Sequence, residues 1–192
     1  MNDPITDALP VPSAAAGFGN DELAVVIPRL RRYALVLTGN PTRSDDLVQD
    51  TLTRAWDNRS YWRPGSDLRA WLFTIMHNVF VNQLAGARRD AANVSLDAED
   101  ERGPAFQVSG GDDPTARIEL QEVMLQVQRL PAEQREVLML VALEGMHYEE
   151  AAATLGIPIG TVMSRLARAR DKLRRNASQQ PFAPRTASER IG

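Results

Sequence analysis

The chain has 192 residues, which is enough for one or two domains, and 43% of them are hydrophobic. The absence of cysteine excludes disulfides, cysteine-ligated zinc and thiol nucleophiles, and no apolar run approaches the ~20 residues of a membrane-spanning helix. The N-terminal residues lack the basic and apolar segments of a signal peptide, so we expect a cytoplasmic protein without membrane insertion.

Acidic and basic residues are concentrated in different segments. The formal net charge of -3 argues mildly against a nucleic-acid ligand. However, acids dominate residues 97–122, whereas six bases accompany the single acid Asp171 over residues 165–175. Because local fields rather than net charge steer DNA binding, the basic segment is a candidate nucleic-acid surface.

The first third of the chain predicts helices. Residues 1–19 are rich in Pro, Ala and Gly and predict a disordered tail. Apolar residues then recur at helical spacing from Leu23 to Leu37, and Pro28 predicts that a short first helix ends there and a second begins. Gly39 and the two residues after it end this element.

The next helix is predicted to begin at Thr42 or Ser44, since either hydroxyl can cap it. Asp45 and Asp46 follow, where the helix dipole favours negative charge. The buried side of this helix is predicted to include Trp56, four residues after an apolar leucine.

A loop is predicted over residues 58–67, which contain aromatic residues, Pro and Gly. A third helix is predicted from about residue 67 to residue 87, with Trp71 and Phe73 on its buried side. No stretch alternates between apolar and polar residues for long enough to predict a strand.

Residues 91–113 are rich in acids, Gly and Pro and predict a flexible linker. Further helices are predicted at about 118–130, 133–143, 148–155 and 160–175. The polar residues 176–192 predict a second disordered tail. The sequence therefore predicts an all-α fold of two small helical domains, at 20–90 and 114–175.

The segment from Tyr148 to Arg170 has the form of a helix-turn-helix motif, with a tight turn at Gly156. An apolar stripe at 3.6-residue spacing anchors the second helix and consists of Val162, Leu166, Ala169 and Leu173. The basic side chains on the other faces are displayed, as a DNA recognition helix requires. A lone basic helix would more often be the solvated face of a bundle, so the turn and the preceding helix carry this interpretation.

Four sequence motifs carry a family resemblance, and they are DDLVQDTL at 45–52 with Ala55 and Trp56 after it, RAWLFTIMHN at 69–78, LPAEQREVL at 130–138 and GTVMSRLARAR at 160–170. The first two resemble regions 2.2 to 2.4 of the extracytoplasmic-function (ECF) sigma factors of the sigma-70 family. The last two resemble region 4 of the same family. The resemblance covers both predicted domains, in the family's order.

The resemblance implies a sigma factor that binds core RNA polymerase and directs promoter-specific transcription initiation, in a stress response. Residues 20–90 would bind core polymerase and the -10 element, and residues 114–175 would bind the -35 element. The implied partners are core RNA polymerase, promoter DNA and an anti-sigma factor. The resemblance implies no cofactor, no metal and no enzymatic activity.

Region 2.2 of the family docks on a coiled coil of the largest polymerase subunit. The resemblance assigns this contact to Asp45, Asp46, Leu47, Gln49 and Asp50. An exposed edge of acids and amides suits a basic helical partner. Helix capping alone is an alternative explanation of the two leading acids, but it explains Gln49 and Asp50 less well.

The resemblance places the melted -10 element against the predicted loop and the start of the third helix. Unstacked bases need aromatic platforms, amide donors and nearby positive charge. The candidate residues are Tyr61, Trp62, Arg63, Arg69 and Asn78.

The resemblance assigns -35 recognition to the last helix. It places Met163, Ser164 and Arg168 at base-facing positions and Thr161 and Arg165 at backbone-facing ones, with Lys172 on the same flank. The family often carries a basic or polar residue where Met163 stands. Methionine makes only apolar contacts, for example with a thymine methyl group, so the -35 specificity at this position departs from the family's pattern.

Three other functions are weaker interpretations. The only histidines, His77 and His147, lie on different domains among apolar residues, which predicts structural roles rather than catalysis. A sigma-like decoy that binds an anti-sigma factor would have lost the basic face that Arg165 and Arg168 provide. A one-domain repressor would leave the motif at 45–56 unexplained.

Overall fold

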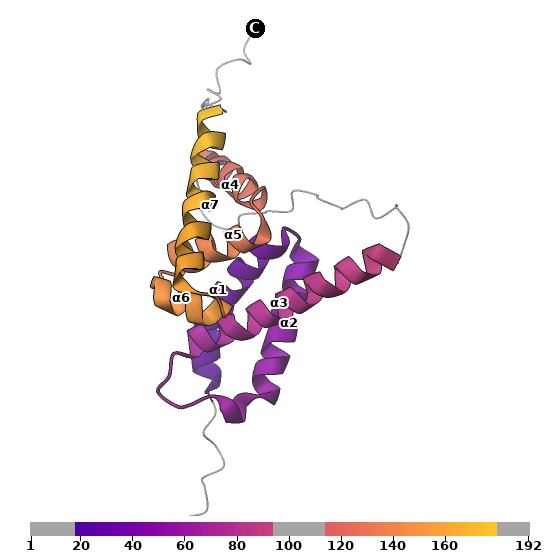
Figure 1. Cartoon of the computed structure of the whole chain (residues 1–192). Coiled ribbons are helices and arrows are strands. Elements are labelled where there is room, and N and C mark those ends of the chain that lie inside the picture. The colour runs from indigo at the N-terminus through magenta and orange to yellow at the C-terminus, as the bar shows by residue number, and fades with distance from the viewer. Residues whose placement is uncertain (1–17, 94–113, 180–192) are drawn as a thin grey trace, which may run out of the picture.

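The computed structural model describes residues 18–93 and 114–179 of the chain (Figure 1). Over these two ranges the backbone forms helices and no strand, which confirms the predicted all-α class. The elements are α1 (Asn20–Thr38), α2 (Pro41–Asp57), the 3-10 turn η1 (Arg59–Tyr61), α3 (Leu68–Asn93), α4 (Pro114–Gln128), α5 (Ala132–Leu138), the π-helical turn η2 (Met139–Leu143), α6 (Tyr148–Leu155) and α7 (Ile159–Gln179). None of the described helices is long and apolar enough to cross a membrane.

The first three helices form one bundle, in which α2 packs against both α1 and α3. Tyr33 of α1 and Phe73 of α3 are fully buried, and their rings meet edge to face with centroids 4.9 Å apart. This geometry is favoured because the positive edge of one ring meets the negative face of the other. Leu47 of α2 completes the centre of the bundle and has no exposed surface.

The helix-turn-helix motif is formed by α6 and α7, and α5 also packs against α7. Val162, Leu166 and Ala169 are at most 1% exposed, which confirms the predicted apolar stripe. Gly156 has a φ of 62° and ends α6 in the left-handed conformation, which places the two helices at an angle.

A π-helical turn separates α5 from α6. In η2 the amide of Glu144 donates to the carbonyl of Met139 at 3.0 Å, five residues earlier, so this turn contains one more residue than an α-helical turn. Gly145, with a φ of 68°, ends the turn, two residues after the predicted end of this helix at about residue 143. The π-helical geometry itself was not predicted.

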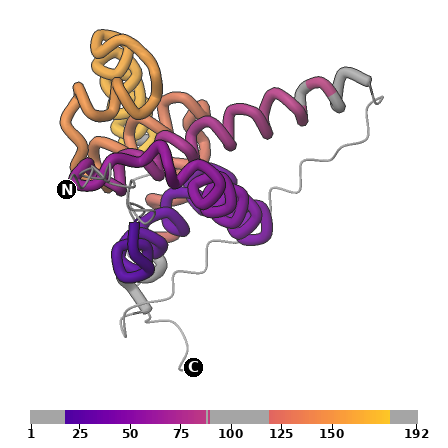
Figure 2. The backbone as a smooth tube through the Cα atoms, turned by 90° about the horizontal axis from the view of Figure 1, so that it is seen from below, coloured from indigo at the N-terminus to yellow at the C-terminus, as the bar shows by residue number. Residues whose placement is uncertain are grey.

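The two bundles pack against each other and share a continuous hydrophobic core. Region-to-region contacts are made by α6 on α3 and by α4 and α5 on α1. Figures 1 and 2 show the second bundle lying over the N-terminal half of α3, while the C-terminal half of α3 projects away from both bundles. The described residues therefore form a closed arrangement of the two parts.

Two predicted helix boundaries are wrong near the N-terminus. Pro28 lies inside α1, which is continuous. Pro28 and Ala24, whose carbonyl loses its helical N–H partner, are both exposed, so water can bond to that carbonyl. The cap of α2 is Asn40, whose Oδ1 accepts from the amide of Arg43 at 3.0 Å. Ser44, a predicted cap, is instead buried in the bundle.

Three other predicted boundaries differ from those in the structure. Phe18 is buried, with its ring centroid 5.9 Å from Trp62 and 5.7 Å from Trp71, so it packs on the first bundle. α3 continues to Asn93 and α7 continues to Gln179, beyond the predicted starts of the linker and of the second tail. The rest of the predicted linker and tails, at 1–17, 94–113 and 180–192, lies outside the described residues.

Candidate nucleic-acid and protein interfaces

The outer face of α7 displays three of the side chains that the sequence predicts to face DNA bases. Met163 is 53% exposed, and Ser164 and Arg168 are also exposed, opposite the buried stripe. Arg168 makes no hydrogen bond or ion pair with any residue that the structure describes. Its guanidinium is therefore available to an external acceptor such as a base edge or a phosphate.

The cations on the flank of α7 are already paired. Arg165 forms an ion pair with Glu133 at the start of α5, with Nη2 and Oε2 2.9 Å apart. Lys172 Nζ donates to the carbonyl of Arg129 at 3.1 Å. These contacts orient both side chains along the helix, as backbone-positioning residues require. Thr161, the remaining predicted flank residue, is half-buried.

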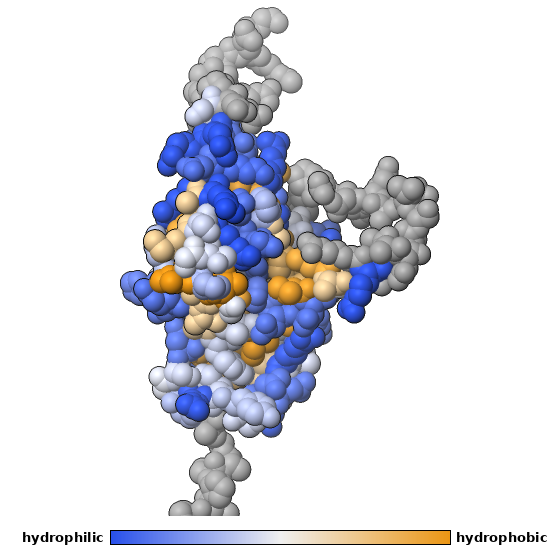
Figure 3. Space-filling view, viewed as in Figure 1, coloured by the Kyte–Doolittle hydropathy of each residue, from blue (hydrophilic) through white to orange (hydrophobic). Residues whose placement is uncertain are grey.

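Apolar side chains accompany the basic ones at the N-terminal end of α7. Figure 3 shows apolar colour on an otherwise hydrophilic surface where α6 and α7 meet. The exposed apolar residues of this end of α7 include Ile159, which is 40% exposed, and Met163. The face can therefore make apolar as well as polar contacts in a DNA groove.

The loop between α2 and α3 displays part of the predicted -10 site. Tyr61 is 78% exposed, and Arg63 is exposed beside it, so both are available to unstacked bases. Trp62 is only 6% exposed because Phe18 covers its ring, so in this conformation it offers no platform for a base. Asn78 is exposed on α3, beyond the loop.

Arg69, also predicted to bind the -10 element, is engaged by the second bundle. Its Nη1 donates to the carbonyl of Glu144 at 2.7 Å, and its Nη2 lies 3.4 Å from Asp67 Oδ2. Asp67 also caps α3, because its Oδ1 accepts from the amide of Ala70 at 3.2 Å. The structure thus brings Arg69 together with the second bundle rather than with Tyr61 alone.

Trp56 was predicted to be buried, and this prediction is wrong. The ring is 53% exposed, and the guanidinium of Arg59 lies 5.0 Å from its centroid. The buried positions of α2 end at Ala55, and Trp56 lies about 100° further round the helix. That rotation was the signal in the sequence that would have placed the ring outside, next to the predicted -10 loop.

The outer edge of α2 displays four of the five side chains predicted to contact core polymerase. Asp45, Asp46, Gln49 and Asp50 are exposed, whereas Leu47 is fully buried and cannot touch a partner in this conformation. The two leading acids lie in the second turn of α2 rather than in the first, so helix capping does not explain them.

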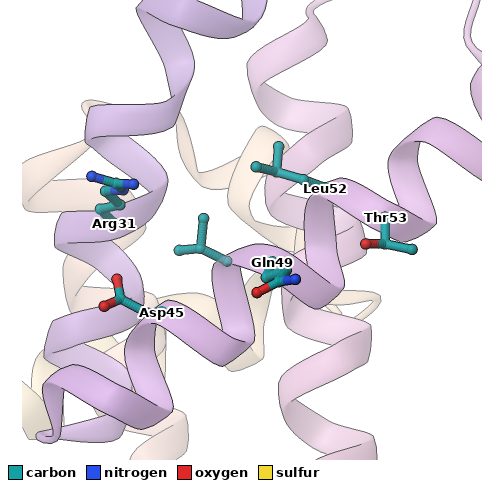
Figure 4. A pocket seen from close by; sticks show the side chains of 6 residues that line it. Arg31, Asp45, Gln49, Leu52 and Thr53 are labelled. Carbon is teal, nitrogen blue, oxygen red and sulfur yellow. The ribbon is translucent and has the colours of Figure 1, made fainter.

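A shallow groove of about 400 Å³ runs between α1 and α2 beside this edge. Figure 4 shows Arg31 on α1 facing α2, with Asp45 and Gln49 on the opposite side of the groove. Val48, Leu52 and Thr53 complete its lining. At the far side of α2, Asp50 Oδ2 accepts from Gln83 Nε2 at 3.0 Å, which couples α2 to α3.

Buried polar groups join the two bundles. His77 Nδ1 of α3 lies 2.8 Å from Glu136 Oε1 of α5, so the structural role of this histidine is a hydrogen-bond contact between the bundles. Arg135 Nη1 donates to the carbonyls of Val36 and Leu37, at 3.2 and 2.6 Å, and so caps the C-terminus of α1. Burial lowers the pKa of Arg135, and the nearby Glu136 opposes this shift.

Tyr33 lies beneath the same interface. Burial raises the pKa of its hydroxyl well above the usual value, and the charges of Glu136 and Glu144 raise it further. Its Oη has no hydrogen-bond partner among the described residues. Over the described ranges, no group of three or more His, Cys, Asp or Glu side chains is placed to bind a metal.

The comparisons with known families divide the chain as the two bundles do. Residues 23–77 match the Sigma2 domain of PhyR, and residues 120–173 match Sigma-70, region 4. These matches cover most of α1, all of α2 and the first ten residues of α3, and most of α4 to α7.

The similarity to individual sigma factors covers most of the chain. An ECF RNA polymerase sigma factor, EcfG of Rhodopseudomonas palustris (strain TIE-1), is 40% identical over 88% of this chain and 85% of its own. The sigma factor RpoE from Bartonella quintana, solved in complex with the anti-sigma factor NepR, has a TM-score of 0.67, with 35% identity over 82% of this chain and 95% of that chain.

A second solved structure, of CnrH in complex with the cytosolic domain of CnrY, has a TM-score of 0.57, with 30% identity over 83% of this chain and 88% of that chain. One family assignment follows from the two bundles, the basic helix-turn-helix face and these similarities over most of the chain. This chain belongs to the ECF RNA polymerase sigma factors, which bind core RNA polymerase and direct it to promoters.

Proposed function

We propose that this sigma factor divides promoter recognition among three surfaces. The exposed polar edge of α2 docks on core RNA polymerase, the loop between α2 and α3 takes the -10 element, and the outer face of α7 takes the -35 element. The observation that carries the proposal is the display of Ser164 and Arg168 on α7, directly opposite the buried stripe. A helix anchored in this way can enter a major groove without disturbing its own core.

We further propose an anti-sigma factor as a partner. RpoE is solved in complex with the anti-sigma factor NepR, and CnrH is solved in complex with the cytosolic domain of CnrY. A regulator of this kind would connect the factor to a stress signal in the cytoplasm, where RNA polymerase works. The chain would then act by binding rather than by catalysis.

A second candidate function is that of a sigma-like decoy, which binds an anti-sigma factor instead of DNA. The match of the first bundle to the Sigma2 domain of PhyR favours it, since PhyR is described as an anti-anti-sigma factor. Arg168, which is exposed and has no partner among the described residues, argues against it, because a decoy has no use for an exposed arginine on its recognition helix.

The test is run-off transcription with purified core polymerase on genomic promoter fragments. A sigma factor yields discrete transcripts that disappear when the protein is omitted. A decoy yields no transcript with core polymerase alone, and instead restores transcription by another sigma factor that an anti-sigma factor has inhibited. That second result would overturn the proposal.

A further inference from the structure

The carboxylate of Glu144, in the second bundle, is buried against the first bundle. Its side chain has no exposed surface, and its Oε2 and Oε1 lie 3.7 Å from Arg29 Nη1 and 3.6 Å from Arg32 Nη2. Its backbone carbonyl accepts from Arg69 Nη1 at 2.7 Å. Three guanidinium groups from α1 and α3 therefore surround one residue of the second bundle.

We propose that Arg29, Arg32 and Arg69 form an anion site that takes a backbone phosphate of promoter DNA, and that Glu144 occupies this site in the closed arrangement. The inference rests on the proposed function, because it assigns a DNA contact to the first bundle. It adds residues of α1 that the sequence motifs do not assign.

The carboxylate of Glu144 fits the site poorly. Neither oxygen accepts a hydrogen bond from a described residue, and both ion-pair distances exceed the 2.7–2.9 Å of charge-assisted bonds. A buried carboxylate without hydrogen bonds is unfavourable, because the ion pairs do not replace the lost water. The site therefore holds Glu144 weakly and is able to exchange it for a better anion.

The three arginines suit a phosphodiester. Arg29 and Arg32 are three residues apart on α1, so their side chains share one face of the helix. They are 45% and 51% exposed even in the closed arrangement, whereas Arg69 is 22% exposed. All three belong to the same bundle, so removal of Glu144 leaves the site assembled. A phosphodiester presents two non-bridging oxygens, which share one negative charge, to such planar donors.

The position of Arg69 points to DNA rather than to another anion. Arg69 lies in the first turn of α3, directly after the loop that displays Tyr61 and Arg63. A single strand whose bases stack in that loop would run its backbone past the start of α3. The same site cannot hold Glu144 and a phosphate together, so the closed arrangement and DNA binding exclude each other.

The test measures binding of the full-length protein to a labelled single-stranded DNA 12-mer by fluorescence anisotropy over a salt series. A second 12-mer with abasic sugars keeps the sugar-phosphate backbone and has no bases. Glu144→Gln removes the competing charge, so it should raise the affinity for both oligonucleotides and steepen the slope of log K against log salt by about 0.7 per phosphate gained. Glu149→Gln, an exposed acid at the start of α6, is the matched control and should change neither.

Two further variants test whether Arg29 and Arg32 hold the phosphate. Addition of Arg29→Ala and Arg32→Ala to Glu144→Gln should return the slope to the wild-type value. The same two substitutions alone, in the holoenzyme, should make open-complex formation less dependent on salt. This second measurement does not require the Glu144 variant to fold, and circular dichroism checks each protein.

Equal slopes for wild type and a folded Glu144→Gln would overturn the inference, as would a gain that survives loss of both arginines. Loss of co-purification with core polymerase in the arginine variants, with unchanged salt dependence, would also overturn it and assign the site to an acidic protein surface. Wild-type run-off transcription is scored separately, so failure of the anion site and failure of the proposed function remain distinguishable.

Discussion

At the scale of single residues, two arginines three positions apart on α7 have different environments. Arg165 is paired with Glu133 and has a side chain only 24% exposed, whereas Arg168 is exposed and unpaired within the described residues. The paired guanidinium is oriented before DNA arrives, and the free one can adapt to a base edge. The two residues should therefore contribute to promoter binding in different ways.

Substitution of Arg168 should change promoter preference. Arg168→Ala removes a candidate bidentate contact, so we expect a loss of about 1–3 kcal/mol on the preferred -35 base and less on other bases. The measurement is holoenzyme transcription from a set of -35 variants. Arg174→Ala, in which an exposed arginine paired with Asp171 is removed from the same helix, is the control. An unchanged ranking of promoters with Arg168→Ala would remove Arg168 from base recognition.

Tyr33 should make the protein sensitive to alkaline pH. The pKa of its hydroxyl is raised in the folded chain, so the folded state keeps a proton that the unfolded chain loses above about pH 10. Its contribution to stability is complete below pH 10 and is lost as the pH rises toward the folded-state pKa, by up to ~1.4 kcal/mol per pH unit.

Tyr33→Phe should remove this loss, and it should cost little stability at neutral pH because the Oη has no partner among the described residues. The measurement is urea denaturation from pH 7 to about pH 11. Tyr148→Phe, at a half-buried position on α6, is the control and should keep the wild-type decline. An identical decline in Tyr33→Phe would contradict the burial of this hydroxyl.

At the scale of elements, α2 separates its two roles by face. One face carries Leu47, Val48 and Ala55 into the bundle, and the opposite edge presents acids and an amide beside the groove next to α1. A partner can therefore bind α2 without access to its core. Substitutions on the exposed edge should therefore leave the fold intact, whereas changes of charge there should alter the affinity for the partner.

Asp50→Arg should abolish co-purification with core polymerase while the circular dichroism spectrum stays that of the wild type. The reason is that a positive charge replaces a negative one on the edge proposed to meet a basic coiled coil. Asp57→Arg, an exposed acid at the end of the same helix, is the control and should co-purify normally. Wild-type co-purification by a folded Asp50→Arg would exclude this edge as the polymerase contact.

The end of α1 depends on a contact from α4. Gly39 has a φ of 67°, and a Cβ at this position would lie 2.9 Å from Gln128 Oε1. Gln128 Nε2 donates to the carbonyl of Val36 at 2.5 Å, so displacement of the amide would also break a cap of α1. Gly65 has a φ of 84° but no atom close to a Cβ, which makes the two glycines a matched pair.

Gly39→Ala should therefore destabilise the protein more than Gly65→Ala. Both pay the left-handed backbone penalty of roughly 1–2 kcal/mol. Only Gly39→Ala should add about 1 kcal/mol for the displaced hydrogen bond. Thermal denaturation of both variants measures the difference. Equal losses would mean that Gln128 does not cap α1 in solution.

The elements also show what a single sequence can predict. The periodic apolar residues of α7 and the glycine at the end of α6 were sufficient for the helix-turn-helix, because both signals are local. Pro28 misled the prediction because it lies on the solvent side of α1, which the sequence alone does not reveal. The burial of Trp62 depends on Phe18, forty-four residues earlier, and such a contact leaves no periodic signal.

At the scale of the whole molecule, the second bundle covers part of the surface of the first bundle that is proposed to bind DNA. The second bundle lies over the start of α3 and engages Arg69, while its own α7 face stays open (Figure 1). Several interface contacts are buried polar pairs such as His77 with Glu136. Such pairs fix the geometry of the interface, but the cost of desolvating them offsets most of their favourable interaction energy. An interface with a small net free energy suits a molecule that must open.

Reversal of one charge should open the molecule. Glu144→Arg would place a fourth cation beside Arg29, Arg32 and Arg69, and like charges at this distance repel. Because the chain has no cysteine, Asp57→Cys and Arg174→Cys can carry a fluorophore pair specifically. Energy transfer between the dyes should fall in Glu144→Arg and stay constant in Glu149→Arg. Constant transfer in both would show that this interface does not keep the bundles closed.

The π-helical turn before Glu144 makes this interface depend on chain length as well as on composition. An α-helix turns by about 100° per residue, so removal of one residue from η2 would restore α-helical phase and rotate Glu144 away from the three arginines. A single-codon deletion at Ala142, an exposed position, would thus release the first bundle without changing the chemistry of any contacting side chain. Reading-frame-preserving deletions, rather than substitutions, are the mutations by which such a molecule would most simply lose its closed form.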